Sequence, residues 1–345
     1  MRILLTADPE LPVPPGGYGG IERIVDSLIG QFRASGHEVG LVARRGSTAA
    51  VDRFFPWPGL HSRSSVSTLR NMFALRRAVG TFHPAVVHSF SRLAYLLPLL
   101  VRGNIELLMS YQRHPGSRQV RSANRLGRGR LRFTGCSEYI CRLGRAGGGL
   151  WSAIPNFVEV NRYTFAECVA PDAPLVFLSR VETIKGPDLA IAIAKASRRR
   201  LILAGNHAER GPEREFWDTK IVPHLGHSGI EWVGEVNDAQ KNELLGRAAA
   251  LLVPIQWDEP FGIVFAEALA CGTPVLTCRR GATPEIVDEG HTGWFLQTVA
   301  DGVAAVRRLG ELDRTACRQT AQTRFSAEGC ADQYQTLYQD MVAPR

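Results

Sequence analysis

The sequence lacks an apolar run long enough to cross a membrane. The nearest candidate, LAYLLPLLV at 93–101, has about half of the roughly 18 residues that a span requires, and Arg102 follows it. The amino terminus, MRILLTADPE, also lacks the charged-then-apolar leader and the small-residue cleavage site of an exported protein. We therefore expect a cytoplasmic protein that is soluble or peripheral at the inner face of the membrane.

Metal-binding patterns are missing as well. The seven cysteines are an odd number without a C-x-x-C pair, and Cys136 and Cys141 stand closest at a useful spacing. Small buried residues explain such cysteines better than zinc does, and a reducing compartment fits them. No D-x-D pair occurs, so the sequence offers no obvious metal clamp. We expect no metal and no resident cofactor.

Lysine is absent from residues 1–160, which contain 21 arginines and nine acids and so carry a balance of +12. The remainder has 20 basic and 24 acidic residues, a balance of −4. The densest stretch, 113–136, is rich in arginine and has no acid. It can be a solvated basic face, or a surface that meets phosphate on an acceptor or on anionic lipid, and both interpretations stay open. Nucleic acid is disfavoured because the stretch lacks interleaved aromatic residues.

A chain of 345 residues suits two domains of roughly 150 residues each. It starts with a short apolar run (2–7), a glycine cluster (14–20), a segment of helical period (21–36) and a second strand, EVGLVA (38–43). We expect further strands at 85–90, 106–111, 132–137, 175–180, 200–205, 230–234, 250–254 and 273–278. This α/β alternation predicts two Rossmann-like, doubly wound parallel sheets.

The expected domain limits follow the same rhythm. The first domain takes residues 1–160 and the second takes 161–322, joined by an irregular segment near 155–172. The last segment, 323–345, is expected to be a helix that packs back toward the first domain. Such domains bind ligands at the carboxyl ends of their strands, so we expect the site in a cleft between the two domains.

The first motif is GGYGGIE, in which Gly19 and Gly20 directly precede a helix. Glycine is needed where backbone N–H groups approach a phosphate at the positive end of a helix. A simple turn explains the motif equally well, because it is neither G-x-G-x-x-G nor a Walker loop.

The second motif, LSRVETIKG at 178–186, places Arg180 at the end of a buried strand and Lys185 five residues later. Both cations can converge on one diphosphate, although alone they could equally be surface residues. The third motif, WDEPFGIVFAEALACGTPVL, puts Glu259 in a loop and Glu267 in the second turn of a helix. Carboxylates there can be partners of the helix dipole, or acceptors for sugar hydroxyls.

The segments GGIE, SRVETIKG, EPFGIVFAEALACGTPV and GATPEIVDEGHTGWF together resemble the retaining, nucleotide-sugar-dependent glycosyltransferases of family four, which have the two-domain GT-B fold. The resemblance covers nearly the whole chain, and the E-x7-E segment is highly specific. It implies that Arg180 and Lys185 hold the donor diphosphate, that Glu259 binds a hydroxyl of the transferred sugar, and that Glu267 binds the ribose. Arg180, Lys185 and Glu259 are the expected catalytic residues. The other donor-binding positions that it implies are Gly19, Gly20, Gly205, Asn206, Gly234, Val236, Phe261, Gly262 and Ile263.

The acceptor side departs from the family. A histidine usually follows the strand that is here LLMSY, but this chain has Gln112 near that place and His114 two residues later. Either side chain could face the sugar. His88, also at a strand end, could contact the acceptor or be a hydrogen-bonded histidine near the core.

The resemblance implies transfer of a hexose from a UDP- or GDP-sugar to a hydroxyl, with retained configuration. The acceptor would be a sugar, a lipid-linked compound or a small molecule, as in glycan, polysaccharide, glycolipid or secondary-metabolite synthesis. Without a metal clamp, Arg180 and Lys185 would stabilise the departing diphosphate. Retention by front-face attack needs no protein nucleophile, in contrast to glycosidases.

Three other interpretations remain. A nucleotide-sugar epimerase shares the architecture but would need an acid and a base near the sugar. An NADP-dependent oxidoreductase could use Arg44 and Arg45 for a 2′-phosphate, but it leaves Glu259 and Glu267 unexplained. A nonenzymatic basic binding protein leaves all the cleft motifs unexplained.

Overall fold

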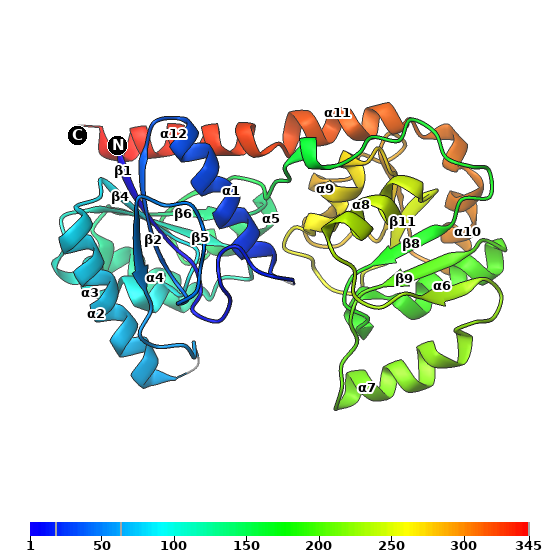
Figure 1. The fold of residues 1–345 in the computed structure, drawn as a ribbon, viewed down its shortest axis with the longest axis horizontal. Helices are drawn as coiled ribbons and strands as arrows, with labels where there is room; N and C mark the ends of the chain where they lie inside the picture. Colours follow the sequence, from blue (N-terminus) through cyan, green and yellow to red (C-terminus); the bar gives the residue numbers. More distant parts are fainter. Residues whose placement is uncertain (18, 63, 344–345) are drawn as a thin grey trace. The chain divides into compact units, whose positions relative to one another are not determined.

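The computed structural model describes residues 1–17, 19–62 and 64–343. The chain divides into two compact units. Unit 1 comprises Met1–Phe157 and Ala327–Arg345, and unit 2 comprises Val158–Ser326. Figure 1 shows a sheet flanked by helices in each of them. The last helix of the chain therefore belongs with the amino-terminal residues.

Unit 1 is built on a seven-stranded sheet in the order β3-β2-β1-β4-β5-β6-β7, with every neighbouring pair parallel. From β1 the chain adds β2 and β3 on one side of the sheet and then returns to add β4 to β7 on the other side, so the strand order switches between β1 and β4. Doubly wound domains bind ligands at the carboxyl ends of the strands at this switch point. The strands are β1 (Arg2–Thr6), β2 (Glu38–Ala43), β3 (Arg53–Pro56), β4 (Val86–Ser89), β5 (Glu106–Tyr111), β6 (Leu131–Gly135) and β7 (Leu150–Ala153).

Six α-helices belong to unit 1 in its described part. They are α1 (Gly20–Ala34), α2 (Ser65–Phe82), α3 (Leu97–Arg102), α4 (Ser117–Gly127), α5 (Glu138–Arg145) and α12 (Ala327–Val342). Helix α12, red in Figure 1, packs beside α1, while α2, α3 and α4 pack as successive neighbours. The core beneath α2, α3 and α4 includes Leu4, Leu75, Leu99, Leu107 and Phe133, all buried.

Unit 2 has a six-stranded parallel sheet in the order β10-β9-β8-β11-β12-β13. Its strand order switches sides between β8 and β11. Its strands are β8 (Leu175–Leu178), β9 (Leu201–Ala204), β10 (Ile230–Trp232), β11 (Ala250–Val253), β12 (Val275–Thr277) and β13 (Gly293–Phe295). Its helices are α6 (Pro187–Ser197), α7 (Pro212–Phe216), α8 (Asp238–Arg247), α9 (Ile263–Ala270), α10 (Val299–Arg307) and α11 (Arg314–Arg324).

The predicted fold class is confirmed by these two parallel, doubly wound sheets. Each strand predicted from the sequence is present within a few residues, but β3, β7 and β13 were not predicted. These three strands lie at the edges of the sheets, and their sequences, RFFP, LWSA and GWF, have no run of aliphatic residues that would mark a buried strand. The units meet in sequence at 157/158 and 326/327, a few residues from the predicted limits at 160 and 322. Among the described residues, no helix combines the length and apolar character needed to cross a bilayer.

Candidate functional site

The carboxyl ends of β8 and β11 carry the charged residues that the sequence singled out in unit 2. Arg180 follows β8 and forms an ion pair with Glu182, with 2.5 Å between guanidinium and carboxylate. Lys185 ends the short 3-10 helix η3 (Thr183–Lys185), and the loop after β11 leads to Glu259. Since β8 and β11 are adjacent and parallel, the loops that carry these side chains leave the sheet on the same side, at the carboxyl ends of the strands.

Lys185 and Glu259 form a buried ion pair. Lys185 Nζ lies 2.5 Å from Glu259 Oε2, and the two side chains are only 12% and 10% exposed. Trp257 Nε1 donates a second hydrogen bond to the same oxygen, at 2.8 Å, and Lys185 Nζ lies 5.0 Å from the Trp257 ring centroid. The pairing offsets the cost of burying both charges and holds each of them in a fixed place. Two residues that the sequence placed in separate motifs are thus in direct contact.

Glu267 has its own lysine. Lys241 Nζ of α8 lies 2.5 Å from Glu267 Oε1, and Tyr163 donates its hydroxyl to that oxygen at 2.8 Å. Burial, together with the Glu267 charge, raises the pKa of Tyr163 well above its usual value, so this hydroxyl stays a donor. Sequence reasoning missed both partners. Lys241 stands in an ordinary amphipathic helix, and Tyr163 lies in an irregular segment, so neither carries a local signal.

The segment that joins the two glutamates starts a helix. Gly262, at φ +88°, is the N-cap of α9, and Ile263 is its first residue. The backbone N–H groups at this end therefore carry the positive end of the helix dipole. Phe261 is buried against Phe325, with 5.7 Å between ring centroids.

Gly205 and Gly234 are brought together at the ends of β9 and β10. Gly205 N donates to Gly234 O at 2.7 Å, and Asn206 O accepts from Val181 N at 2.8 Å. Gly205 has φ +137°, and a Cβ there would lie 2.0 Å from Ser179 O, so only glycine fits. Val236 lies two residues beyond Gly234 and is partly exposed.

An aromatic group borders Gly205. Trp232 Nε1 donates to Gly205 O at 2.9 Å. The rings of His207 and Trp217 stack with 4.2 Å between centroids, and Trp232 packs edge-on against Trp217. The loop expected to border a base thus has flat apolar surfaces beside it, which the sequence analysis did not anticipate.

The loop after β12 packs against the backbone of Glu259. Ala282 N donates to Glu259 O at 2.8 Å. Gly281, at φ +58°, approaches so closely that a Cβ would lie 2.3 Å from the same oxygen. The backbone position of Glu259 therefore depends on this loop.

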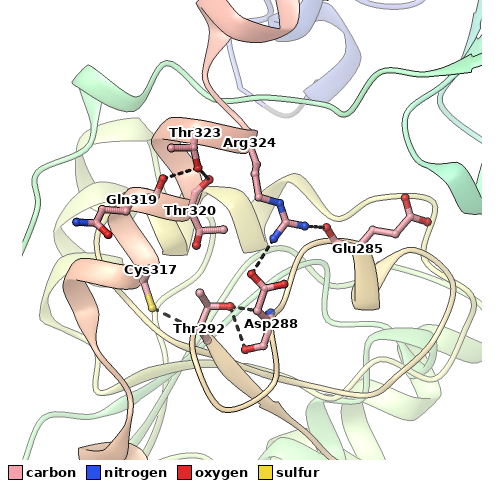
Figure 2. A network of polar contacts seen from close by, with 8 residues as sticks. All are labelled: Glu285, Asp288, Thr292, Cys317, Gln319, Thr320, Thr323 and Arg324. Carbon is pink, nitrogen blue, oxygen red and sulfur yellow. Dashed lines mark hydrogen bonds and ion pairs between the residues drawn. The ribbon is translucent and has the colours of Figure 1, made fainter.

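Figure 2 shows how the far end of the same loop is fastened to α11. Arg324 donates to Asp288 Oδ2 at 2.8 Å and also bonds the carbonyl of Glu285. Asp288 N donates in turn to Thr292 Oγ1 at 2.9 Å. The segment GATPEIVDEGHTGWF therefore contacts the backbone of Glu259 at its start and is held to α11 by Arg324 further along.

In unit 1, Gly19 and Gly20 lie at the start of α1 as the sequence predicted. Gly19 adopts φ +150°, and Arg23, one turn into the helix, donates to Gly17 O at 2.9 Å. Glu22 is buried beside this terminus, and burial raises the pKa of its carboxyl above the usual value.

His88 lies in the core of unit 1. Its Nδ1 is 2.5 Å from the hydroxyl of Tyr338, and its Nε2 is 2.5 Å from Ser110 Oγ. Burial lowers the pKa of His88 to about 3, so the ring is neutral at physiological pH. These contacts fit a hydrogen-bonded core histidine, and they leave no ring nitrogen for an acceptor.

Gln112 and His114 line a cavity of about 420 Å³ in unit 1, at the carboxyl ends of β4 and β5. His114 Nε2 lies 3.3 Å from the hydroxyl of Tyr139. The amide oxygen and nitrogen of Gln112 are both buried and have no partner among the described residues. Of the two candidates for the missing family histidine, Gln112 has the unsatisfied hydrogen-bonding groups.

Two family models cover most of the chain. The model described as Glycosyltransferase Family 4 matches residues 18–162, and the model described as Glycosyl transferases group 1 matches residues 170–324. The first match falls almost wholly in unit 1 and the second in unit 2.

Curated relatives match over shorter stretches. The chain is 32% identical to a glycogen synthase of Mycobacterium tuberculosis over 177 residues, which are 49% of this chain and 41% of the relative. It is 30% identical to a D-inositol 3-phosphate glycosyltransferase of Mycobacterium bovis over 178 residues, 49% of this chain and 37% of the relative. The matched region thus spans less than half of each relative.

Solved structures match over the full length. AviGT4, a glycosyltransferase involved in avilamycin A biosynthesis, is 27% identical with a TM-score of 0.74, covering 100% of this chain and 98% of that one. The sucrose-phosphate synthase of Thermosynechococcus elongatus is 18% identical with a TM-score of 0.80, covering 99% and 98%. HepE of Anabaena, solved with UDP-glucose, is 19% identical with a TM-score of 0.70, covering 98% and 99%. With both family models matched and both sheets in place, the chain belongs to the GT-B glycosyltransferases of the family-four type.

Proposed function

We propose that this protein is a retaining hexosyltransferase that takes its sugar from a nucleotide diphosphate, with UDP- or GDP-sugars as the first candidates, and transfers it to a hydroxyl. The observation that carries the proposal is the pair of buried glutamates of the E-x7-E segment in unit 2, each fixed by a lysine. Carboxylates held in this way can accept hydrogen bonds from the hydroxyls of a sugar and of a ribose. The product would belong to glycan, polysaccharide, glycolipid or secondary-metabolite synthesis.

The donor residues divide the work. Glu267 binds the ribose, and Glu259 binds a hydroxyl of the transferred sugar. Gly205, Asn206, Gly234 and Val236 border the base. The start of α9, at Phe261, Gly262 and Ile263, adds backbone N–H groups. Among solved relatives, HepE was crystallised with UDP-glucose, which supports a nucleotide sugar as the donor.

Arg180 and Lys185 are proposed to stabilise the departing diphosphate. Departure of a nucleoside diphosphate builds negative charge on the leaving oxygen, and fixed cations lower that barrier without reorganising. The guanidinium forks toward two oxygens, whereas the ammonium acts as a point charge. Both residues already have a carboxylate partner, Glu182 and Glu259, and these partners keep them in position before the donor arrives. This arrangement supports transfer without a metal ion.

The test has two stages. Thermal-shift measurements with UDP, GDP, ADP and their sugars should find one nucleotide that raises the melting temperature, because a ligand that binds only the folded chain stabilises it. Proton NMR of the product, taken before mutarotation, should then show the donor's anomeric configuration. Release of free nucleoside diphosphate separates transfer from epimerisation of the sugar. No shift with any nucleotide, or an inverted linkage, would contradict the proposal.

A retaining reaction makes a further demand on unit 1. An inverting enzyme needs a base there, and Asp8, Glu10 and Glu22 are the carboxylates near its first glycine loop. Burial raises the pKa of Asp8, and Glu10 accepts a hydrogen bond from Ser62 Oγ at 2.5 Å. For a retaining enzyme, Asp8→Asn and Glu10→Gln should reduce the rate less than Glu259→Gln does. Loss of a true base should instead cost about 100-fold or more.

We also propose that unit 1 binds anionic membrane surfaces. Between residues 53 and 137 the sequence has 14 arginines and one acid, Glu106. On α2, three apolar side chains at i, i+3 and i+7 point to solvent, with exposed fractions of 61% for Val66, 53% for Leu69 and 59% for Phe73. Arginine heads beside an exposed apolar stripe are typical of helices that lie in a membrane interface.

A further inference from the structure

The cavity of unit 1 is apolar on one side. Its wall there is formed by Leu93, Leu97 and Leu100 near α3, by Ala123 and Leu126 of α4, and by Met109 at the end of β5. The space of about 420 Å³ is large enough for a ligand of moderate size. Leu97 and Leu126 are 39% and 41% exposed, so the apolar surface continues from the cavity to solvent.

The other side is polar and unsatisfied. Asp8 and Gln112 line the cavity at the carboxyl ends of β1 and β5. Asp8 Oδ1 and both amide atoms of Gln112 are buried without a hydrogen-bond partner among the described residues, and so is the hydroxyl of Tyr111, another lining residue. Buried polar atoms in native proteins almost always have partners, so a cluster of unpaired ones at a cavity indicates a ligand or water that satisfies them.

Two arginines also belong to the lining of this cavity. Arg92 and Arg113 line the same cavity and are exposed. They are charged neighbours of Asp8, but neither guanidinium forms a hydrogen bond or an ion pair with a described residue. The cavity lining has these two cations and one carboxylate, while Glu10 and Glu22, which also lie near Asp8, stand outside the lining. Exposed guanidinium groups at the cavity favour an anionic group on the ligand.

We propose that this cavity binds an anionic amphiphile: a molecule with a phosphate or carboxylate near Arg92 and Arg113, a hydroxyl or other polar group at Gln112, and an apolar body between α3 and α4. The inference rests on the proposed function in one respect, that such a molecule would be the acceptor. A neutral sugar would leave the leucine wall in contact with water, and a fully apolar ligand would leave the amide of Gln112 unpaired.

The inference is tested by calorimetry on the full chain without nucleotide, with probes that separate the parts of the ligand. Octyl phosphate carries both the anion and the chain, octyl glucoside has the chain without the anion, and inorganic phosphate has the anion alone. We expect octyl phosphate to bind with one-to-one stoichiometry and about tenfold or more tightly than either of the others. Octanoate as a fourth probe shows whether a carboxylic acid substitutes for the phosphate of a lipid-type head. Equal affinity for inorganic and octyl phosphate would overturn the proposal.

Variants place the binding in this cavity. Arg113→Ala should weaken octyl phosphate about tenfold, since it removes a charged contact, whereas Arg118→Ala should leave the affinity unchanged. Arg118 is the matched control because it is exposed on the neighbouring helix and lies outside the cavity. Ala123→Leu narrows the apolar part and should weaken octyl phosphate but not inorganic phosphate. Equal effects of Arg113→Ala and Arg118→Ala would show a nonspecific cationic surface and contradict the inference.

Failure of the inference and failure of the proposed function give different results. Nucleotide affinity is measured on the same samples, and it reports on the candidate donor site rather than on this cavity. A chain that binds nucleotide but not octyl phosphate would keep the proposed function and lose the amphiphile. A chain that binds octyl phosphate but no nucleotide would keep the cavity assignment and lose the glycosyltransfer.

Discussion

At the scale of single residues, both glutamates of the E-x7-E segment are already bonded to a lysine before any donor is present. Lys185 holds Glu259, and Lys241 holds Glu267 together with Tyr163. A carboxylate has about four lone-pair sites, so each glutamate can keep its lysine and still accept a hydroxyl. The lysines therefore orient the carboxylates, and a bound sugar does not have to displace them.

The first prediction concerns Glu267. Glu267→Ala should weaken the affinity for the nucleotide by about 1.5–3 kcal/mol, because a charged acceptor to the ribose hydroxyls is lost. Isothermal titration with UDP or GDP measures this. Glu243→Ala is the control, since among the described residues this surface carboxylate on α8 pairs only with Arg247. Unchanged affinity in Glu267→Ala would rule out its contact with the ribose.

The second prediction concerns metal ions. If Arg180 and Lys185 stabilise the leaving diphosphate, transfer should survive an excess of EDTA, whereas Arg180→Ala should lose most of the rate. Removal of one charge-stabilising donor typically costs about 100-fold or more. Initial rates with and without chelator, for both proteins, decide the matter. Strict dependence on magnesium or manganese would refute the role given to Arg180.

The third prediction follows from the buried histidine. Burial lowers the pKa of His88 from 6.5 to about 3, so the unfolded chain binds the proton more readily than the folded chain does. This contribution to stability is complete above the unfolded pKa and is lost as the pH falls from about 6.5 toward 3. Between pH 7 and pH 5 it should remove about 2 kcal/mol from the free energy of unfolding.

Urea unfolding at the two pH values measures the loss. His88→Gln, which has no titrating group at this position, is the comparison. It should be less stable at pH 7 but lose about 2 kcal/mol less than the natural protein on acidification. Equal losses in the two proteins would mean that His88 is not held neutral in the folded state.

At the scale of helices and strands, the sequence predicted what periodic patterns and breakers can express. Helix α1 and the strands β2 and β5 lie within one or two residues of their predicted limits, because each combines an apolar run with a glycine or proline boundary. The edge strand β3 gave no signal, since its two partly buried residues, Phe54 and Phe55, stand side by side between two exposed ones and show no alternation. The family resemblance supplied Glu259 and Glu267, but not Lys241, which reaches Glu267 only through the packing of α8 against α9.

The loop after β12 gives the fourth prediction. Gly281→Ala adds a Cβ that would lie 2.3 Å from Glu259 O, and alanine disfavours the positive φ of this position. The loop must shift and carry the backbone of Glu259 with it. Transfer should fall about tenfold or more, because small displacements of catalytic groups are costly, while nucleotide affinity changes little.

Gly310→Ala is the control for this prediction. A Cβ at Gly310 meets nothing within 4 Å, so the substitution changes the residue type without crowding. Kinetic constants and nucleotide titrations on both variants separate the two outcomes. A parallel loss of nucleotide affinity in Gly281→Ala would show a general unfolding of unit 2, and full activity would show that the loop does not position Glu259.

At the scale of the whole molecule, the charge is distributed by unit. Residues 1–157, the larger part of unit 1, have 21 arginines and eight acids, and unit 2 holds both buried glutamates of the candidate donor site. The sequence located this charge but not the apolar stripe beside it. Val66, Leu69 and Phe73 lie on α2, and on a sequence pattern alone they would be assigned to the core. Only the packing of α2 shows that Leu75 and Phe82 fill that role and leave the stripe in solvent.

The last prediction is that unit 1 attaches the protein to anionic bilayers through this face. Each buried apolar side chain of the stripe can contribute about 1.5–3 kcal/mol, and each arginine near the surface about 1 kcal/mol. Sedimentation with vesicles should therefore require phosphatidylglycerol or another anionic lipid. Binding should weaken as salt rises, since the screening length shortens to about 8 Å at physiological ionic strength.

The double variant Leu69→Ser/Phe73→Ser should release the protein from the vesicles without unfolding it. Leu150→Ser removes an equally exposed side chain of β7, at 64%, and should bind like the natural protein. Binding that is equal in both variants would mean that α2 does not enter the membrane.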